Sequence, residues 1–313
     1  ILNFEPVAVT TLVRTAPVLP ATVNANYADS STAPVPVVWD SIPETQYLAT
    51  GAFDVFGTVE GTLIRPVAHV TVEEVTEDLF DVLRKKIATM LTGGDDYDPL
   101  DPDIAAQIAV VTAKAQSHWS TMDKTSGRTY LWSDLAAASD SDCDCRSSAD
   151  MTASYTRLKE MAIAYATKGS ALYHDAALFS DISQGLDWMY ENRYNEVIQR
   201  TDNWWDWWIG SPIALNEIVV LLYDELLPSQ IANYMNAVDR FTPIVDMTAA
   251  NRVWKSQVVT VRGIIVKDAA KIAHARDGLS DVFLYTTSSD GFYKDGSFIQ
   301  HEVFPYTGGY GAS

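Results

Sequence analysis

The last part of the sequence gathers residue types that can move protons and bind anions. The segment DGFYKDGSFIQHEVFPYTGGYG, residues 290–311, contains His301, Tyr306 and Tyr310 among glycines that let the backbone approach a ligand closely. An imidazole can act as an acid, a base or a hydrogen-bond donor, and a phenol can exchange a proton with a reacting group. Because lone histidines and tyrosines beside glycine-rich turns are often packing residues, a structural role is the alternative for this segment.

A second segment, DNWWDWWIGSP, carries an unusual density of aromatic side chains. Four tryptophans fall within five positions: Trp204, Trp205, Trp207 and Trp208. On a helix, residues 204 and 208 share a face and residue 205 points elsewhere, so a single core cannot easily take all four rings. We therefore expect a pair of them to line a groove, where aromatic faces stack on sugar rings and Asn203 reaches hydroxyl or acetamide groups. The alternative is a buried aromatic cluster beside a helix that begins at Ser211.

Composition limits the classes of protein to which the chain can belong. Its 313 residues, 47% of them hydrophobic, are enough for one large or two ordinary domains with proper cores. The net charge of -19 argues against nucleic acid as a partner, because binding phosphates needs clustered Lys and Arg. No run of eighteen apolar residues and no signal-peptide pattern at the start occurs, so we expect no membrane partner.

The sequence offers little for a metal or an organic cofactor. Cys143 and Cys145 lie too close together for an ordinary disulfide and have no further zinc ligands nearby. The aspartates between residues 140 and 144 lack the glycine and the distant glutamate of an EF-hand calcium loop. HExxH and Gly-rich phosphate motifs are also missing. We predict a surface loop here and no cofactor.

Residues 1–72 show the two-residue alternation of short β-strands. The alternation is clearest in ATVNANYAD, PVPVVWD, GAFDVFGTVEG and IRPVAHVTV, which are separated by turn-forming stretches. This pattern predicts a small β-sandwich with Trp39 in its core. The region resembles the bacterial Ig-like modules of large secreted or wall-associated proteins, which implies a spacer or a weak carbohydrate contact rather than chemistry.

From residue 73 onward the periodicity becomes helical. The segment VEEVTEDLFDVLRKKIATMLTGG has acidic residues early, cations later and glycine at its end, as helices prefer. Further helical runs are predicted at 101–119, 151–169, 211–226, 228–241 and 256–278. The loops DCDCRSSAD and DMTAAN would join helices, and in helical arrays such connections commonly build the site.

Three blocks of the second region resemble the family 8 polysaccharide lyases, which include hyaluronate, chondroitin AC and xanthan lyases. They are NRYNEVIQRTDNWWDWWIGSPIALNEIVVLL, TAANRVWKSQVVTVRGIIVKDAAKIAHARDGLS and SDGFYKDGSFIQHEVFPYTGGYG, in the order of the family. The resemblance implies a multidomain fold: an all-β Ig-like sandwich over 1–72, then an all-α incomplete (α/α) toroid over 73–313. It also implies that the sequence ends within the toroid, before C-terminal β-sandwich domains that would be partners of this part.

The resemblance assigns roles to particular residues. The catalytic asparagine of the family lies in a GAN motif, which reads AAN here and gives Asn251, with Ala249 in place of the usual glycine. The histidine that follows DGSFIQ is His301, and the tyrosine nine residues later is Tyr310 rather than Tyr306. The aromatic patch of the family corresponds to Trp204 and Trp205, with Asn203 beside them, and Arg252 is assigned to substrate binding. The arginine and glutamate of the family site would lie beyond Ser313.

This resemblance implies a secreted or wall-associated bacterial lyase that cleaves an acidic polysaccharide at uronic acid by β-elimination. Hyaluronan or chondroitin is the expected substrate, and xanthan is the alternative. Another enzymatic hypothesis is a hydrolase that uses Asp206 and Asp295 as paired carboxylates. A hypothesis of a different class is a fragment that binds carbohydrate without cleaving it.

Overall fold

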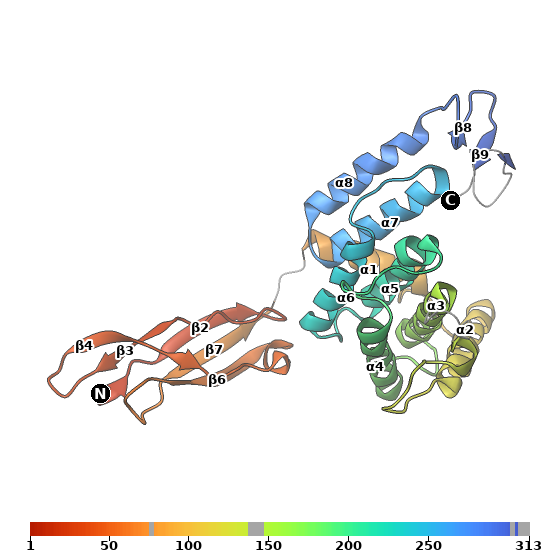
Figure 1. The fold of residues 1–313 in the computed structure, drawn as a ribbon. Coiled ribbons are helices and arrows are strands. Elements are labelled where there is room, and N and C mark those ends of the chain that lie inside the picture. The colour runs from red at the N-terminus through yellow and green to blue at the C-terminus, as the bar shows by residue number, and fades with distance from the viewer. Residues whose placement is uncertain (75–77, 137–146, 301–303, 306–313) are drawn as a thin grey trace. The chain divides into compact units, whose positions relative to one another are not determined.

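The computed structural model describes residues 1–74, 78–136, 147–300 and 304–305. The chain divides into two compact units, a β unit within Ile1–Glu77 and a helical unit that begins at Asp78 (Figure 1). The loop predicted around Cys143 and Cys145 lies outside the described residues. Within the described ranges, no helix combines the length and the apolar character that crossing a membrane requires.

The β unit contains two sheets of short strands. The first has the order β1–β3–β4 with antiparallel neighbours: β1 (Asn3–Phe4), β3 (Thr22–Asn26) and β4 (Thr32–Pro36). The second has the order β2–β7–β6–β5: β2 (Val7–Leu12), β7 (Val67–Glu73), β6 (Gly51–Thr58) and β5 (Val38–Trp39). In this sheet β2 and β7 are parallel and the other pairs are antiparallel.

Alternation along β6 and β7 builds the core of this unit. Val55, Ala68 and Val70 are buried at every second position, so the apolar face of each strand points inward. Trp39 is half-buried against this cluster, and its indole N–H donates to the carbonyl oxygen of Pro20 (2.7 Å). The predicted strands are therefore confirmed, whereas Trp39 packs against the core from its edge and is not one of its buried members.

The helical unit is built from eight α-helices in its described part. They are α1 (Leu79–Thr92), α2 (Pro102–Thr121), α3 (Ser148–Ala166), α4 (Ala176–Asn192), α5 (Ser211–Leu222), α6 (Pro228–Phe241), α7 (Ala249–Ile265) and α8 (Ala269–Ser280). α5 is apolar on nearly every side and packs against α1, α3 and α7, which places it in the centre of the unit (Figure 1). Side-chain N-caps begin five of these helices, at Asp78, Asp101, Ser147, Asp175 and Asp268.

Several sequence predictions need correction. The run 256–278 is not one helix, because the chain breaks at Lys267 (φ 56°) and the Asp268 carboxylate caps α8. The segment DMTAAN is not wholly a loop, since α7 already begins at Ala249. Helix α4 was not predicted. A small antiparallel sheet, formed by β8 (Gly291–Phe292), β9 (Phe298–Gln300) and β10 (Phe304–Pro305), was also missed.

Candidate active site

The beginnings of α3, α5 and α7 lie side by side in the helical unit. The backbone N–H of Ser148, in the first turn of α3, donates to the carboxylate of Asp202 (3.2 Å), and its hydroxyl accepts from the backbone N–H of Asn203 (3.2 Å). Trp205, just before α5, makes an edge-to-face contact with Trp254 in the second turn of α7 (ring centroids 6.3 Å apart). Residues from three parts of the sequence thus meet at one end of the helices.

The tryptophan segment divides into a buried part and a half-buried part. Trp207 is only 4% exposed, and its indole N–H donates to the carbonyl oxygen of Thr201 (2.7 Å). The rings of Trp204 and Trp208 lie 5.5 Å apart and are half-buried, as is Trp205. Trp204, Trp205 and Trp208 therefore keep partly exposed aromatic surface beside the helix starts, whereas Trp207 belongs to the core.

Asn203 is exposed at the edge of these rings. Its side-chain oxygen accepts from the backbone N–H of Trp205 (3.1 Å), which fixes the amide at the start of the segment. Its amide nitrogen makes no hydrogen bond to another residue of the described part. This nitrogen can therefore donate to a hydroxyl or carbonyl group of a ligand that lies on the rings.

Asn251 lies in the first turn of α7, half-buried, on the helix face that also carries Trp254 and Lys255. Its side chain has no hydrogen-bond partner among the residues that the structure describes. The ammonium group of Lys255 is buried, pairs with Asp246 and lies 5.3 Å from the centre of the Trp208 ring. The neutral amide of Asn251 therefore lies one helical turn from Trp254 and from Lys255, whose ammonium group is already paired with Asp246.

Arg252 points to the neighbouring side of α7 and is engaged within the protein. Its Nε donates to the carbonyl oxygen of Met247 (2.8 Å), and one terminal nitrogen donates to the carbonyl oxygen of Gly278 (2.9 Å). The same nitrogen lies 3.2 Å from the carboxylate of Asp281. The guanidinium therefore ties the start of α7 to the end of α8, and its assignment to substrate binding stays a prediction.

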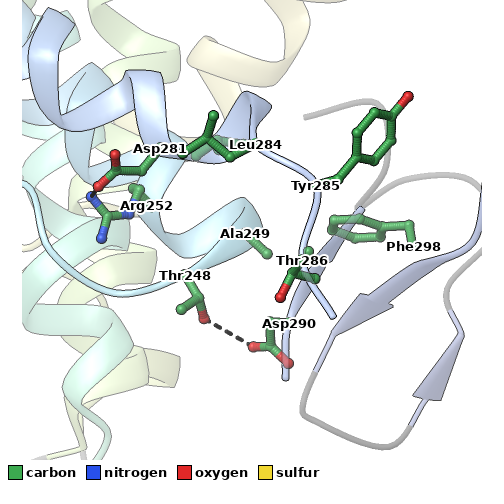
Figure 2. Close-up of a pocket in the computed structure, with 11 residues that line it drawn as sticks. Thr248, Ala249, Arg252, Asp281, Leu284, Tyr285, Thr286, Asp290 and Phe298 are labelled. Atoms are coloured by element: carbon green, nitrogen blue, oxygen red, sulfur yellow. Dashed lines mark hydrogen bonds and ion pairs between the residues drawn. The ribbon is translucent and has the colours of Figure 1, made fainter. Parts of the chain in front are cut away.

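A cavity of about 260 Å³ opens beside Arg252 and Asp281 (Figure 2). It is lined by the start of α7, the turn after α8 and the β8–β9 hairpin: Thr248, Ala249, Arg252, Asp281, Val282, Leu284, Tyr285, Thr286, Asp290, Gly291 and Phe298. The Thr248 hydroxyl faces Asp290 and donates to its carboxylate (3.0 Å), as Figure 2 shows. Ala249 and Phe298 line the same cavity, so β9 lies next to the start of α7.

The other two predicted catalytic residues, His301 and Tyr310, lie outside the described residues, as does Tyr306. Strand β9 ends at Gln300, immediately before His301 in the sequence. The catalytic roles of Asn251, His301 and Tyr310 therefore stay predictions. Of the predicted site residues that the structure describes, Asn203, Trp204, Trp205 and Asn251 lie around the same helix starts.

Comparison with known families bears directly on this arrangement. The family described as Polysaccharide lyase family 8, N terminal alpha-helical domain, matches residues 88–313, and the Bacterial Ig-like domain (group 4) matches residues 4–62. The chain belongs to polysaccharide lyase family 8. The resemblances to this family and to bacterial Ig-like modules, and the fold class that they imply, are confirmed.

Three relatives show how much of a family 8 protein this chain represents. It is 49% identical to a xanthan lyase of Bacillus sp. (strain GL1), over 75% of the chain and 25% of that protein. It is 38% identical to a hyaluronate lyase of Thermasporomyces composti, over 75% of the chain and 29% of that protein. The structure of a Streptomyces coelicolor A3 chondroitin AC lyase in complex with chondroitin sulphate matches 75% of the chain and 31% of its own, with a TM-score of 0.67 and 38% identity. The family 8 chain therefore spans about a quarter to a third of the length of these relatives.

The two carboxylates of the hydrolase hypothesis have separate partners in the family 8 chain. Asp206 is 5% exposed and accepts hydrogen bonds from the hydroxyls of Ser148 (2.7 Å) and Thr152 (2.8 Å) on α3. Asp295 lies in the β8–β9 hairpin, where the backbone N–H and the hydroxyl of Ser297 hold its pKa below the usual range. Asp295 is therefore ionised near neutral pH, which is unsuited to a general acid, and nothing in the geometry pairs it with Asp206.

Sequence reasoning missed several residues around the site. Trp254 and Lys255 follow Asn251 by three and four positions, a spacing that places side chains on one helix face and could have found them. Ser148 and Thr152 could not be found in this way, because each contacts Asp206 across more than fifty residues of sequence. Their contacts come from the packing of α3 against the segment before α5.

Proposed function

We propose that the protein carrying this chain cleaves an acidic polysaccharide at uronic acid by β-elimination. The observation that carries this proposal is the contact between Trp205 and Trp254, which places Asn251 beside the tryptophans (ring centroids 6.3 Å apart). A sugar ring stacked on Trp204 or Trp205 would lie within reach of a neutral amide donor. Membership of family 8 supports the reaction class.

The chemistry demands a donor of this kind. Elimination removes the proton at C5 of a uronic acid and expels the oxygen at C4, which builds negative charge next to a carboxylate. Asn251 and His301 would hold that carboxylate and stabilise the developing charge by hydrogen bonds directed at it, as an oxyanion hole does. Tyr310 would take the C5 proton as phenolate and pass it to the leaving oxygen. Because the ordinary pKa of a tyrosine is about 10, nearby positive charge would have to lower it.

Which acidic polysaccharide is the substrate is a separate part of the proposal. The sequence favoured hyaluronan or chondroitin, with xanthan as the alternative. The 49% identity to a xanthan lyase, against 38% to a hyaluronate lyase, supports testing xanthan first. We also propose that the protein acts outside the cell, since such polymers are too large to cross a membrane. Lyase activity in culture medium rather than in cell extract is the measurement that checks this.

The test compares residues 1–313 with the longest form that the natural gene encodes, each mixed with xanthan, hyaluronan or chondroitin sulfate. β-Elimination creates a conjugated double bond that absorbs in the ultraviolet, whereas hydrolysis does not. Asn251→Ala is expected to lower kcat by about a hundred- to a thousandfold. Cleavage without ultraviolet absorption would refute the lyase proposal. Binding without cleavage by either form would favour the carbohydrate-binding alternative.

A further inference from the structure

The segment that carries the tryptophans is not an ordinary α-helix. Asp206–Gly210 form a π-helical turn, η3, closed by a hydrogen bond from the backbone N–H of Ser211 to the carbonyl oxygen of Asp206. Such turns are rare, and they appear frequently at functional sites because the extra residue redirects neighbouring side chains. Trp205 directly precedes this turn, and its ring packs against Gly210 at the end of the turn.

Hydrogen bonds from α3 hold the first residue of η3 in place. The buried carboxylate of Asp206 accepts from Ser148 (2.7 Å) and from Thr152 (2.8 Å), one helical turn apart on α3. Thr152 also shares a hydrogen bond with the hydroxyl of Ser211 at the end of the turn (2.9 Å). Both ends of η3 are therefore attached to one face of α3.

Gly210 leaves room for one particular ring. Its φ of -62° lies in the ordinary helical region, so backbone conformation does not require glycine there. A Cβ atom at this position would lie 2.4 Å from Cζ3 and 3.0 Å from Cε3 of Trp205, and 2.9 Å from Cγ2 of Thr152. The indole of Trp205 therefore lies directly on the Gly210 backbone.

We propose that Gly210 and Asp206 are positioning residues that set the orientation of Trp205 in the sugar-binding face. Gly210 provides the flat surface on which the indole rests, and Asp206 attaches the turn that carries Gly210 to α3. The ring then meets Trp254 edge-on (86° between planes), which aligns its free surface with the helix face of Asn251. This inference rests on the proposed function, because it assigns Trp205 a sugar to bind.

The test replaces Gly210 by Ala and measures binding of xanthan or hyaluronan by quenching of tryptophan fluorescence. Loss of one well-aligned stacking contact is expected to weaken binding about three- to tenfold, with a changed near-UV circular dichroism spectrum in the absence of polymer. The matched control is Gly185→Ala, a helical glycine of α4 whose added methyl would meet the side-chain tips of Met122 and Leu158. We expect it to leave both readouts unchanged.

Double variants separate positioning from general packing. In a Trp205→Phe background the smaller ring leaves space, so Gly210→Ala should have little further effect on affinity. Adding Thr152→Ser, which removes the other nearby methyl but keeps the hydroxyl, should not restore binding. An equal loss of affinity in the Trp205→Phe background, or full rescue by Thr152→Ser, would overturn the inference.

Three further outcomes of these experiments have defined consequences. Should Gly210→Ala fail to fold, Asp206→Asn carries the test, and it should give the same change in spectrum and affinity. Unchanged affinity in folded variants, while the wild type binds, overturns the positioning role alone. If neither residues 1–313 nor the longest natural form binds an acidic polysaccharide, the proposed function is overturned, and the inference with it.

Discussion

Ala249 is the residue at which the structure makes its sharpest prediction about stability. It begins α7 with φ of +46°, in the left-handed region that favours glycine, and it is 6% exposed. The GAN motif of the resembled family has glycine at this position. We expect Ala249→Gly to stabilise the helical unit.

The expected magnitude is a difference between two opposing effects. A left-handed conformation costs an L-residue about 1–2 kcal/mol, which glycine would not incur. Glycine also loses about 0.4–1 kcal/mol more conformational entropy on folding. The net gain is therefore about 0.5–1 kcal/mol. Ala250 is the matched control, because it is equally buried in the same turn but is not among the residues with positive φ. Ala250→Gly should destabilise by about 1 kcal/mol.

The assay is urea unfolding followed by tryptophan fluorescence. Of the nine tryptophans, Trp39 lies in the β unit and the others in the helical unit, so the signal reports mainly on the latter. The two variants should differ by about 1.5–2 kcal/mol, with Ala249→Gly above the wild type. If Ala249→Gly loses as much stability as Ala250→Gly, the left-handed conformation at residue 249 is not the controlling feature.

Two further predictions concern buried charge. Arg262 is 1% exposed and pairs with the partly exposed Asp239, so Asp239→Ala should lower the free energy of unfolding by about 3 kcal/mol, the low end for a buried pair. Lys271→Ala, which removes the partly exposed second partner of Asp239, should lower it by less than about 1 kcal/mol, and equal losses in urea unfolding would contradict this. Glu225 accepts a hydrogen bond from Tyr165 (3.3 Å), and burial raises the pKa of its carboxyl group. Its ionisation therefore destabilises the folded state as the pH rises above the pKa of an unfolded glutamate. Glu225→Gln should therefore raise Tm at pH 7 but not at pH 4, and an equal change at both values would refute the assignment.

Local patterns explain how much of the fold was predictable. Alternation of apolar and polar residues correctly predicted β6 and β7. The helical period between Pro228 and Phe241 predicted α6 with its observed bounds. The break between α7 and α8 was missed because Lys267 and Asp268 carry no glycine or proline signal. The left-handed conformation of Lys267 overrides local preference. Capping by Asp268 is local, because its carboxylate accepts from the backbone N–H groups of Ala270 and Lys271.

In the candidate site, too, the arrangement of neighbouring residues was predictable and contacts between distant segments were not. Helical spacing correctly placed Trp204 and Trp208 on one face, with ring centroids 5.5 Å apart, and directed Trp205 elsewhere. The attachment of Asp206 to α3 was not predictable, since its partners lie 54 and 58 positions away in the sequence. The Asp206 carboxylate, which the hydrolase hypothesis assigned to catalysis, thus accepts hydrogen bonds from two hydroxyl groups.

The charges around Asn251 explain why a neutral amide suits the proposed reaction. Two cations lie within one turn of it, but Lys255 pairs with Asp246 and Arg252 with Asp281. The start of α7 has no side-chain cap, and the hydroxyl of Thr248 donates to the carboxylate of Asp290. Its first backbone N–H groups and the helix dipole therefore lie beside the cavity that Thr248 and Ala249 line, where they favour negative charge. A substrate carboxylate held by Asn251 would gain this stabilisation without separating either ion pair. Asn251→Asp should accordingly abolish binding of acidic polymers more completely than Asn251→Ala, a difference that affinity measurements on the two variants would reveal.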